Sequence, residues 1–226
     1  MPLAAHYYLL TSLPALGALG DAPPVSLREL YERAGEAGDV RQVVAAVLLE
    51  HDLMQRQAFL AKELDRVEPV VLSESQVRGE GPLPQYLQGE ASTAGALVDD
   101  VTWEAYFCHV AGLSGRLGCP FLREWVGFEV ALRNALVVAR ARTLELAGDE
   151  YIVAGELARE EALVGSIVAR WSAAEDLLSA QRAVDQGRWE WLNDHCRWYS
   201  FGADEAAAYA RGLLLLHRWR KLGTDE

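Results

Sequence analysis

The strongest constraint on the fold is an apolar stripe in the second half of the chain that follows the repeat of an α-helix. Its members fall at i, i+4, i+7, i+11, i+15 and i+18, and they are Phe121, Trp125, Phe128, Leu132, Leu136 and Ala139. This spacing places them on one face of a single helix. Pro120 suits the first turn of such a helix and Gly148 suits its end. We therefore expect a long helix over 120–148 that buries this face.

Helical patterns account for most of the remaining chain. Ser26 and Glu29 form a capping box, which predicts a helix over 27–36. Apolar residues at helical spacing predict another over 39–64, with a break near His51 and Asp52. The same criteria predict helices over 102–116, over 172–184 after a capping box at Ser172, over 188–198 and over 204–222. No segment alternates long enough to form a sheet, so the predicted fold class is all-α, a multi-helix bundle.

The stretch from Val67 to Gly95 differs in composition from the rest. Prolines and glycines are scattered there among polar residues, which predicts a long loop with one helical turn over 84–88. A loop of this length is uncommon inside a compact domain. Two interpretations stay open: residues 1–226 form a single all-helical domain, or they form two lobes divided by the loop 67–95.

Composition narrows the possible functions. The formal net charge of −12 disfavours nucleic-acid binding, because counterion release requires clustered Lys and Arg. The same charge disfavours a broad electrostatic attachment to an anionic membrane. No window reaches the roughly 18 uninterrupted apolar residues of a membrane span, and the start lacks the basic residues of a signal peptide. With an odd number of cysteines as well, we expect a cytoplasmic protein.

Residues with catalytic or metal-binding chemistry do not complete any motif. His51-Asp52 and Asp99-Asp100 are the residue types of a helical metal-dependent hydrolase, but no further ligands follow at helical spacing. Cysteine and histidine, the residue types that bind structural zinc, also occur, but not in the spaced pairs that such sites use. They are Cys108, His109, Cys119, His195 and Cys196. We expect no enzyme activity, no metal and no cofactor. A hydrolase using His51, Asp52 and Asp99 or Asp100 is the alternative from another class.

Polar residues beside the apolar stripe raise a separate question. Glu129 and Arg133 are four residues apart, which predicts an exposed ion pair on the helix surface. Asn134 leaves two alternatives open, a surface position or a position in which Asn134 and one charge are buried and tie helices together.

Tryptophans and arginines near the end of the chain are the candidate interface. On a helix, Trp191 and Trp198 share a face, while Trp189 lies about 160° around from Trp191. One face can enter the core and the other is then available to a partner. A locally basic cluster follows, for which favourable charge at a helix C-terminus is the alternative explanation. The predicted interface residues are Trp189, Trp191, Arg211, Arg218 and Arg220.

Four segments carry a resemblance to a known family. In chain order they are YYLLTSLPAL, FLREWVGFEVALRNAL, EYIVAGELA and GRWEWLNDHCRWYSFGADEAAAYARGLLLLHRWRKL. The chain resembles a bacterial family encoded within V-type ATPase operons. That family is more distantly similar to the C-type adaptor of the V/A-type ATPases, whose eukaryotic counterpart is the d-type adaptor.

The resemblance implies an all-helical, funnel-like adaptor of the central stalk. Such an adaptor sits on the membrane rotor ring, receives the central shaft and carries torque between the two motors. The implied partners are the V/A-type ATPase proteins of the rotor ring and the central shaft. The implied location is the cytoplasmic face of the membrane, reached through protein contacts. A transient assembly or regulatory factor of the same ATPase is the alternative.

Overall fold

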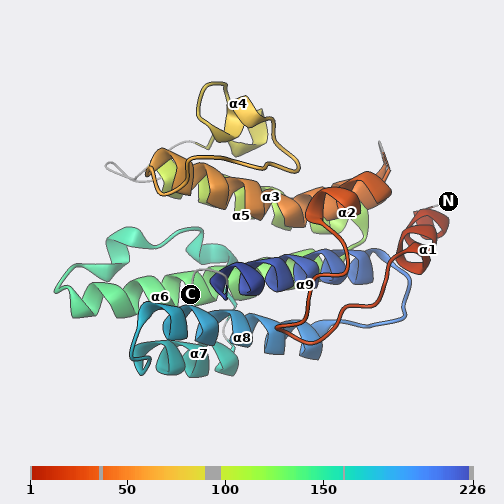
Figure 1. The fold of residues 1–226 in the computed structure, drawn as a ribbon. Coiled ribbons are helices and arrows are strands. Elements are labelled where there is room, and N and C mark those ends of the chain that lie inside the picture. Colours follow the sequence, from red (N-terminus) through yellow and green to blue (C-terminus); the bar gives the residue numbers. More distant parts are fainter. Residues whose placement is uncertain (1, 36–37, 90–97, 160, 224–226) are drawn as a thin grey trace. The chain divides into compact units, whose positions relative to one another are not determined.

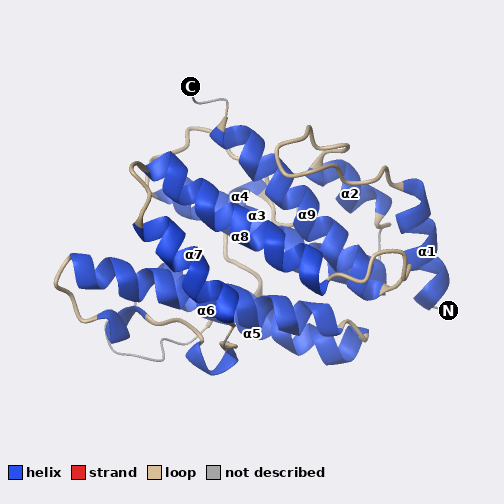
Figure 2. Cartoon of the chain, turned by 90° about the horizontal axis from the view of Figure 1, so that it is seen from below, coloured by secondary structure: helices blue, strands red, loops and turns tan. Residues whose placement is uncertain are grey.

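The structure is a computed structural model that describes residues 2–35, 38–89, 98–159 and 161–223. Within these ranges the chain forms helices joined by loops, with no strand (Figure 2). The all-α prediction is confirmed. The helices are α1 (Pro2–Ser12), α2 (Leu27–Arg33), α3 (Asp39–Leu60), α4 (Glu74–Val77), η1 (Gln85–Leu87), α5 (Val98–Leu117), α6 (Pro120–Thr143), η2 (Gly148–Tyr151), η3 (Gly155–Leu157), α7 (Ala162–Ser172), α8 (Leu177–His195) and α9 (Ala203–Leu222).

The chain divides into two compact units. Unit 1 comprises Met1–Leu83, Arg116–Cys119 and His195–Glu226, and unit 2 comprises Pro84–Gly115 and Pro120–Asp194. Unit 1 therefore contains both ends of the sequence. One crossing between the units falls inside the predicted loop 67–95.

Unit 1 is built on α3 and α9, which pack along each other (Figure 1). Helices α1 and α2 pack against both of them. The interior is mainly aliphatic, with fully or almost fully buried Val43, Val44, Val47, Leu48, Leu213 and Leu215. The predicted helix over 204–222 is confirmed as α9, whose C-cap is Gly223.

Helix α3 runs unbroken through His51 and Asp52, so the predicted break there is wrong. The Asp52 carboxylate accepts hydrogen bonds from the backbone amides of Val70 (2.8 Å), Val71 (2.7 Å) and Leu72 (2.7 Å). These residues belong to the irregular segment 67–72, which we call the unit 1 strap. Polar residues occur in the middle of α3 because that face holds the strap. Burial raises the pKa of the Asp52 carboxyl, and the three amide hydrogen bonds oppose this rise.

The segment 67–95 is more ordered than its composition suggested. The predicted helical turn over 84–88 is confirmed as η1. A second short helix, α4, begins with a capping box in which Ser73 and Gln76 bond each other's backbone amides. Residues 90–95 of the predicted loop lie outside the described residues. Glu36, the predicted end of an earlier helix, also lies outside them, and α2 already ends at Arg33.

Unit 2 is built around α6. The first four residues of the predicted stripe are buried, and Leu136 and Ala139 are half-buried. The helix ends at Thr143, not at Gly148, because the backbone turns with a positive φ of 57° at Glu145. Gly148 instead begins η2, which folds back onto α6: a Cβ there would lie 3.4 Å from Cα of Val138.

A single helix, α8, replaces the two helices predicted over 172–184 and 188–198. Ser172 is the last residue of α7, so the predicted capping box is wrong. The side chain that accepts from the first turn of α8 is Asp176, whose Oδ1 lies 2.7 Å from the Ser179 amide. Gly187 lies within α8 where α7 approaches closely, since a Cβ there would be 2.3 Å from Cγ1 of Ile167.

The end of α8 also differs from the prediction. The helix stops at His195, so Trp198 lies beyond it and does not share a helical face with Trp191. The chain instead bends through Tyr199 and Phe201, whose φ values are 67° and 53°. Their amides donate to the buried carboxylate of Glu205, at 3.0 Å and 2.6 Å. Glu205, in the first turn of α9, therefore holds the bend that follows α8.

Candidate protein-binding groove

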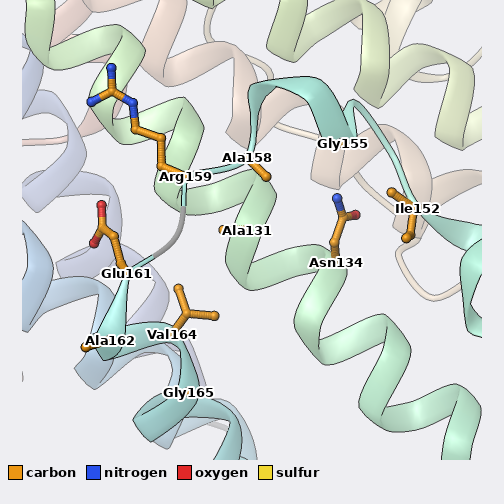
Figure 3. Close-up of a pocket in the computed structure, with 10 residues that line it drawn as sticks. All are labelled: Ala131, Asn134, Ile152, Gly155, Ala158, Arg159, Glu161, Ala162, Val164 and Gly165. Atoms are coloured by element: carbon orange, nitrogen blue, oxygen red, sulfur yellow. The ribbon is translucent and has the colours of Figure 1, made fainter.

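A groove runs along α6 within unit 2. It consists of two adjoining hollows of about 730 Å³ and about 400 Å³, and Asn134 and Gly165 line both of them. Figure 3 shows the larger hollow, with α6 on one side, α7 on the other and the segment 152–159 across the top. We call the two hollows together the α6–α7 groove, and we call the segment 152–159 the unit 2 strap.

The unit 2 strap is fixed to α6 by the side-chain amide of Asn134. Its Nδ2 donates to the Val153 carbonyl at 2.9 Å, and its Oδ1 accepts from the Val153 amide at 3.1 Å. Farther along the strap, the Arg159 amide donates to the Gly127 carbonyl at 3.1 Å. Asn134 is 9% exposed, so the buried alternative is correct, but the side chain ties a strap to α6 instead of joining two helices. The strap in turn lines one side of the larger hollow.

Small and aliphatic side chains form most of the groove wall. Helix α6 contributes a row of alanines at intervals of four, namely Ala131, Ala135 and Ala139, together with Val138. Helix α7 contributes Ala162, Val164, Gly165 and Val168. Such a wall allows the backbone of another helix to come close, because few side-chain atoms stand between the two axes.

Charged residues mark the two ends of the groove. The aliphatic stem of Arg159 crosses Gly127 in the first half of α6, and Arg142 lies in the last turn of α6. Arg142 follows Gly127 by fifteen positions of the helix, which corresponds to about 22 Å along the axis. Within the described ranges neither arginine forms an ion pair, whereas the neighbouring Arg140 packs over the ring of Trp171 at 5.8 Å. Glu161 is the acidic residue of the lining.

Behind the groove, α6 is held to α8 by a buried ion cluster. Arg188 donates to Glu129 through Nε at 3.1 Å and through Nη2 at 3.0 Å, and its Nη1 donates to Asp185 at 3.0 Å. The predicted exposed pair between Glu129 and Arg133 is therefore wrong, because Glu129 is 5% exposed and faces α8. Arg133 instead pairs with Asp100 of α5 at 2.9 Å. Burial lowers the pKa of the Arg133 guanidinium, and Asp100 opposes this.

The predicted interface residues lie elsewhere. Trp191 is 1% exposed, stacks on Phe128 with ring centroids 4.9 Å apart, and also contacts Phe121. Trp189 is half-buried, so the two tryptophans do face differently, as the helical spacing predicted.

The three predicted arginines belong to α9 in unit 1. Arg211 is 1% exposed and donates to Glu50 of α3 at 2.6 Å, while the half-buried Arg218 donates to the same carboxylate at 3.1 Å. Arg220 is exposed in the last turn of α9. Trp191 and Arg211 thus have internal packing partners, and none of the five residues belongs to the described lining of the groove.

The residues of the alternative hydrolase site are divided between the units. His51 and Asp52 belong to unit 1, and Asp99 and Asp100 belong to unit 2. Nε2 of His51 lies 2.6 Å from Nε2 of Gln55, and burial lowers the pKa of His51 to about 4. Among the described residues, no group of three or more Cys, His, Asp or Glu side chains is placed to hold a metal ion.

Sequence reasoning missed the α6–α7 groove. The relevant pattern was present as three alanines at intervals of four, Ala131, Ala135 and Ala139, of which the last also ends the bulky stripe of the same helix. None of the helices in the described part of the chain has the length and apolar content needed to cross a membrane. Comparisons with protein-family models, with curated proteins and with solved structures find no match.

Proposed function

We propose that this chain is a non-catalytic helical adaptor that works by binding other proteins, as a central-stalk component of a V/A-type ATPase. The observation that carries the protein-binding part is the α6–α7 groove, an apolar surface with a charged residue at each end. The ATPase part rests on the four segments that resemble proteins of V-type ATPase operons. In this proposal the chain joins the central shaft to the rotor ring and is held at the cytoplasmic membrane face by protein contacts.

The buried ion clusters support a mechanical role. Carboxylate–guanidinium contacts depend on direction as well as distance, so each cluster opposes sliding of one helix along the other. In unit 1 the cluster joins α3 to α9, and in unit 2 it joins α6 to α8. Close packing around them keeps compressibility low, which suits a component that transmits torque.

The test is an affinity purification of the tagged chain from native membranes, with the stoichiometry of the recovered proteins measured by mass spectrometry. We expect one copy per ATPase, recovered together with the shaft and ring proteins. Recovery at much less than one copy would favour the transient assembly or regulatory factor. Recovery without any ATPase protein, from cells in which the ATPase is intact, would overturn the proposal.

A further inference from the structure

We propose that the α6–α7 groove binds an acidic amphipathic α-helix of a partner protein, about four turns long. The inference rests on the shape, lining and charge of the groove in unit 2. It does not depend on which complex the chain joins, so it can succeed or fail separately from the ATPase proposal.

The shape of the groove matches a helix. Its walls are two helices, and along α6 its lining extends from Ala131 to Arg142, about 16 Å of helix axis. A helix laid along the groove can contact both α6 and α7, since packed helices lie about 8–10 Å apart, depending on the side chains at the contact. The lining offers alanine, glycine and valine at those contacts.

The lining also predicts the apolar face of the bound helix. Apolar residues at i, i+3, i+4 and i+7 are the usual anchors of a helix in a groove. Within the lining, Ile152 is 44% exposed, and the adjoining Tyr151, just outside the lining, is 36% exposed. Leu144 and Leu146, just beyond the end of α6, are 60% and 50% exposed. These side chains extend the apolar surface toward the Arg142 end.

Charge decides which helix fits. Arg142 and Arg159 stand at opposite ends of the groove and form no ion pair within the described ranges, although the chain as a whole carries a net charge of −12. In Figure 3 the Arg159 guanidinium points away from the hollow, and Arg159 is exposed at this end of the groove. The lining holds these two arginines against one acidic residue, Glu161, so its net charge favours a partner helix with carboxylates in its first and last turns over a basic one.

Gly165 provides a way to block the groove without disturbing the fold. It is the fourth residue of α7, and a Cβ built there meets no atom within 4 Å. Gly165→Leu therefore places a side chain into the groove while leaving the packing of unit 2 unchanged. Gly112 of α5 is a matched control, because it is also an exposed helical glycine whose Cβ would meet no atom within 4 Å.

The experiment uses the full chain and a displayed library of amphipathic helices of about 16 residues. The apolar positions vary among Leu, Ile, Val and Ala, and the polar positions in the first and last turns vary among Glu, Asp, Lys, Arg and Ser. Peptides retained by the wild-type chain are sequenced, and the affinity of the most enriched peptides is measured by fluorescence anisotropy. We expect acidic residues to be enriched in both end turns. Gly165→Leu should weaken binding by about tenfold or more, and Gly112→Leu should leave it unchanged.

Charge reversal completes the test. The double variant Arg142→Glu and Arg159→Glu should lose the acidic peptides and bind versions with lysines in the same positions. Enrichment of basic end turns, an equal effect of Gly165→Leu and Gly112→Leu, or a failure to retain any helix would each overturn the proposal. Circular dichroism and thermal unfolding of every variant separate loss of binding from loss of fold.

Discussion

Each unit contains a buried ion cluster, and the two clusters are built in opposite ways. In unit 1 the carboxylate of Glu50 accepts from both Arg211 and Arg218. In unit 2 the guanidinium of Arg188 donates to both Glu129 and Asp185. Both clusters join residues far apart in the sequence, by 161 positions for Glu50 and Arg211 and by 59 for Glu129 and Arg188.

The difference teaches how each unit should respond to the loss of its central residue. A carboxyl group can take up a proton and become neutral, whereas a guanidinium stays charged at any pH at which proteins fold. If Arg188 is removed, acid can neutralise the two carboxylates that shared it. If the charge of Glu50 is removed, no change of pH can neutralise the two arginines.

The largest expected effects come from the two central residues. We expect Glu50→Gln and Arg188→Met each to lower the free energy of unfolding by about 3–5 kcal/mol, because each removes one side of a buried ion cluster. Urea denaturation measures the loss, and hydrogen exchange of peptides from each unit shows where it falls.

The pH dependence then separates the two variants. In Arg188→Met the folded state should bind more protons than the unfolded state, because burial favours the neutral carboxyl once the guanidinium is gone. Its stability relative to the wild type should therefore recover as the pH falls from 7 toward 5. Glu50→Gln should show no such recovery. The same pH response in both variants would contradict this account.

The interiors of the units also differ, since unit 1 is mainly aliphatic and α8 packs on α6 through aromatic rings. We expect Trp191→Ala to cost about 3–5 kcal/mol, because its ring is buried on Phe128 and Phe121. Trp189→Ala should cost clearly less, since Trp189 is half-buried. Thermal unfolding of the two variants provides the measurement, and equal small shifts would show that this packing does not stabilise unit 2.

Acid should act first on unit 1. The pKa of His51 is about 4 in the folded chain against 6.5 ordinarily, and that of His217 is lowered as well, with burial as the main cause for both. Between pH 6.5 and 4 the unfolded chain binds protons that the folded chain does not, so stability falls as the pH falls. For His51 alone the loss should reach about 2–3 kcal/mol.

The control for this effect is His51→Gln, which should flatten the stability profile between pH 6.5 and 4. Hydrogen exchange at about pH 5, inside that window, should show faster exchange in the peptides of unit 1 before those of unit 2. If His51→Gln keeps the full wild-type dependence of stability on pH, His51 is not the source of that dependence.

The smallest expected effects on the free energy of unfolding come from the residues that hold the two straps. The substitutions there are also the most closely matched in shape. The Asp52 carboxylate only accepts hydrogen bonds, and it accepts three from amides of the unit 1 strap. The Asn134 side chain both donates and accepts, and it bonds the carbonyl and the amide of Val153. The isosteric exchanges Asp52→Asn and Asn134→Asp should each cost about 1–3 kcal/mol, because each leaves a buried polar group unmatched. Hydrogen exchange should accelerate at 70–72 in the first variant and at Val153 in the second, and exchange unaltered at those amides would contradict the assignment.

Local sequence patterns predicted the helices better than their ends. Helix α9 was predicted to within one residue because Gly223 follows the last helical turn directly. The end of α6 was misplaced because the backbone turns at Glu145, a residue with no special preference for that conformation. The break expected in α3 was wrong because Asp52 faces the unit 1 strap, and the division expected in α8 was wrong because the helix continues through Asp185, which pairs with Arg188 one turn later.

The sequence by itself determined the all-helical class, the buried face of α6 and the different facing of Trp189 and Trp191. Each follows from spacing within a single helix, which depends only on the helical repeat. The tertiary structure alone decided that Glu129 pairs with Arg188 instead of Arg133, that Asp52 and Asn134 hold straps, and that the alanine row of α6 borders a groove. These depend on which segments meet in space, because a buried charge or amide takes its partner from whatever helix or strap packs against it.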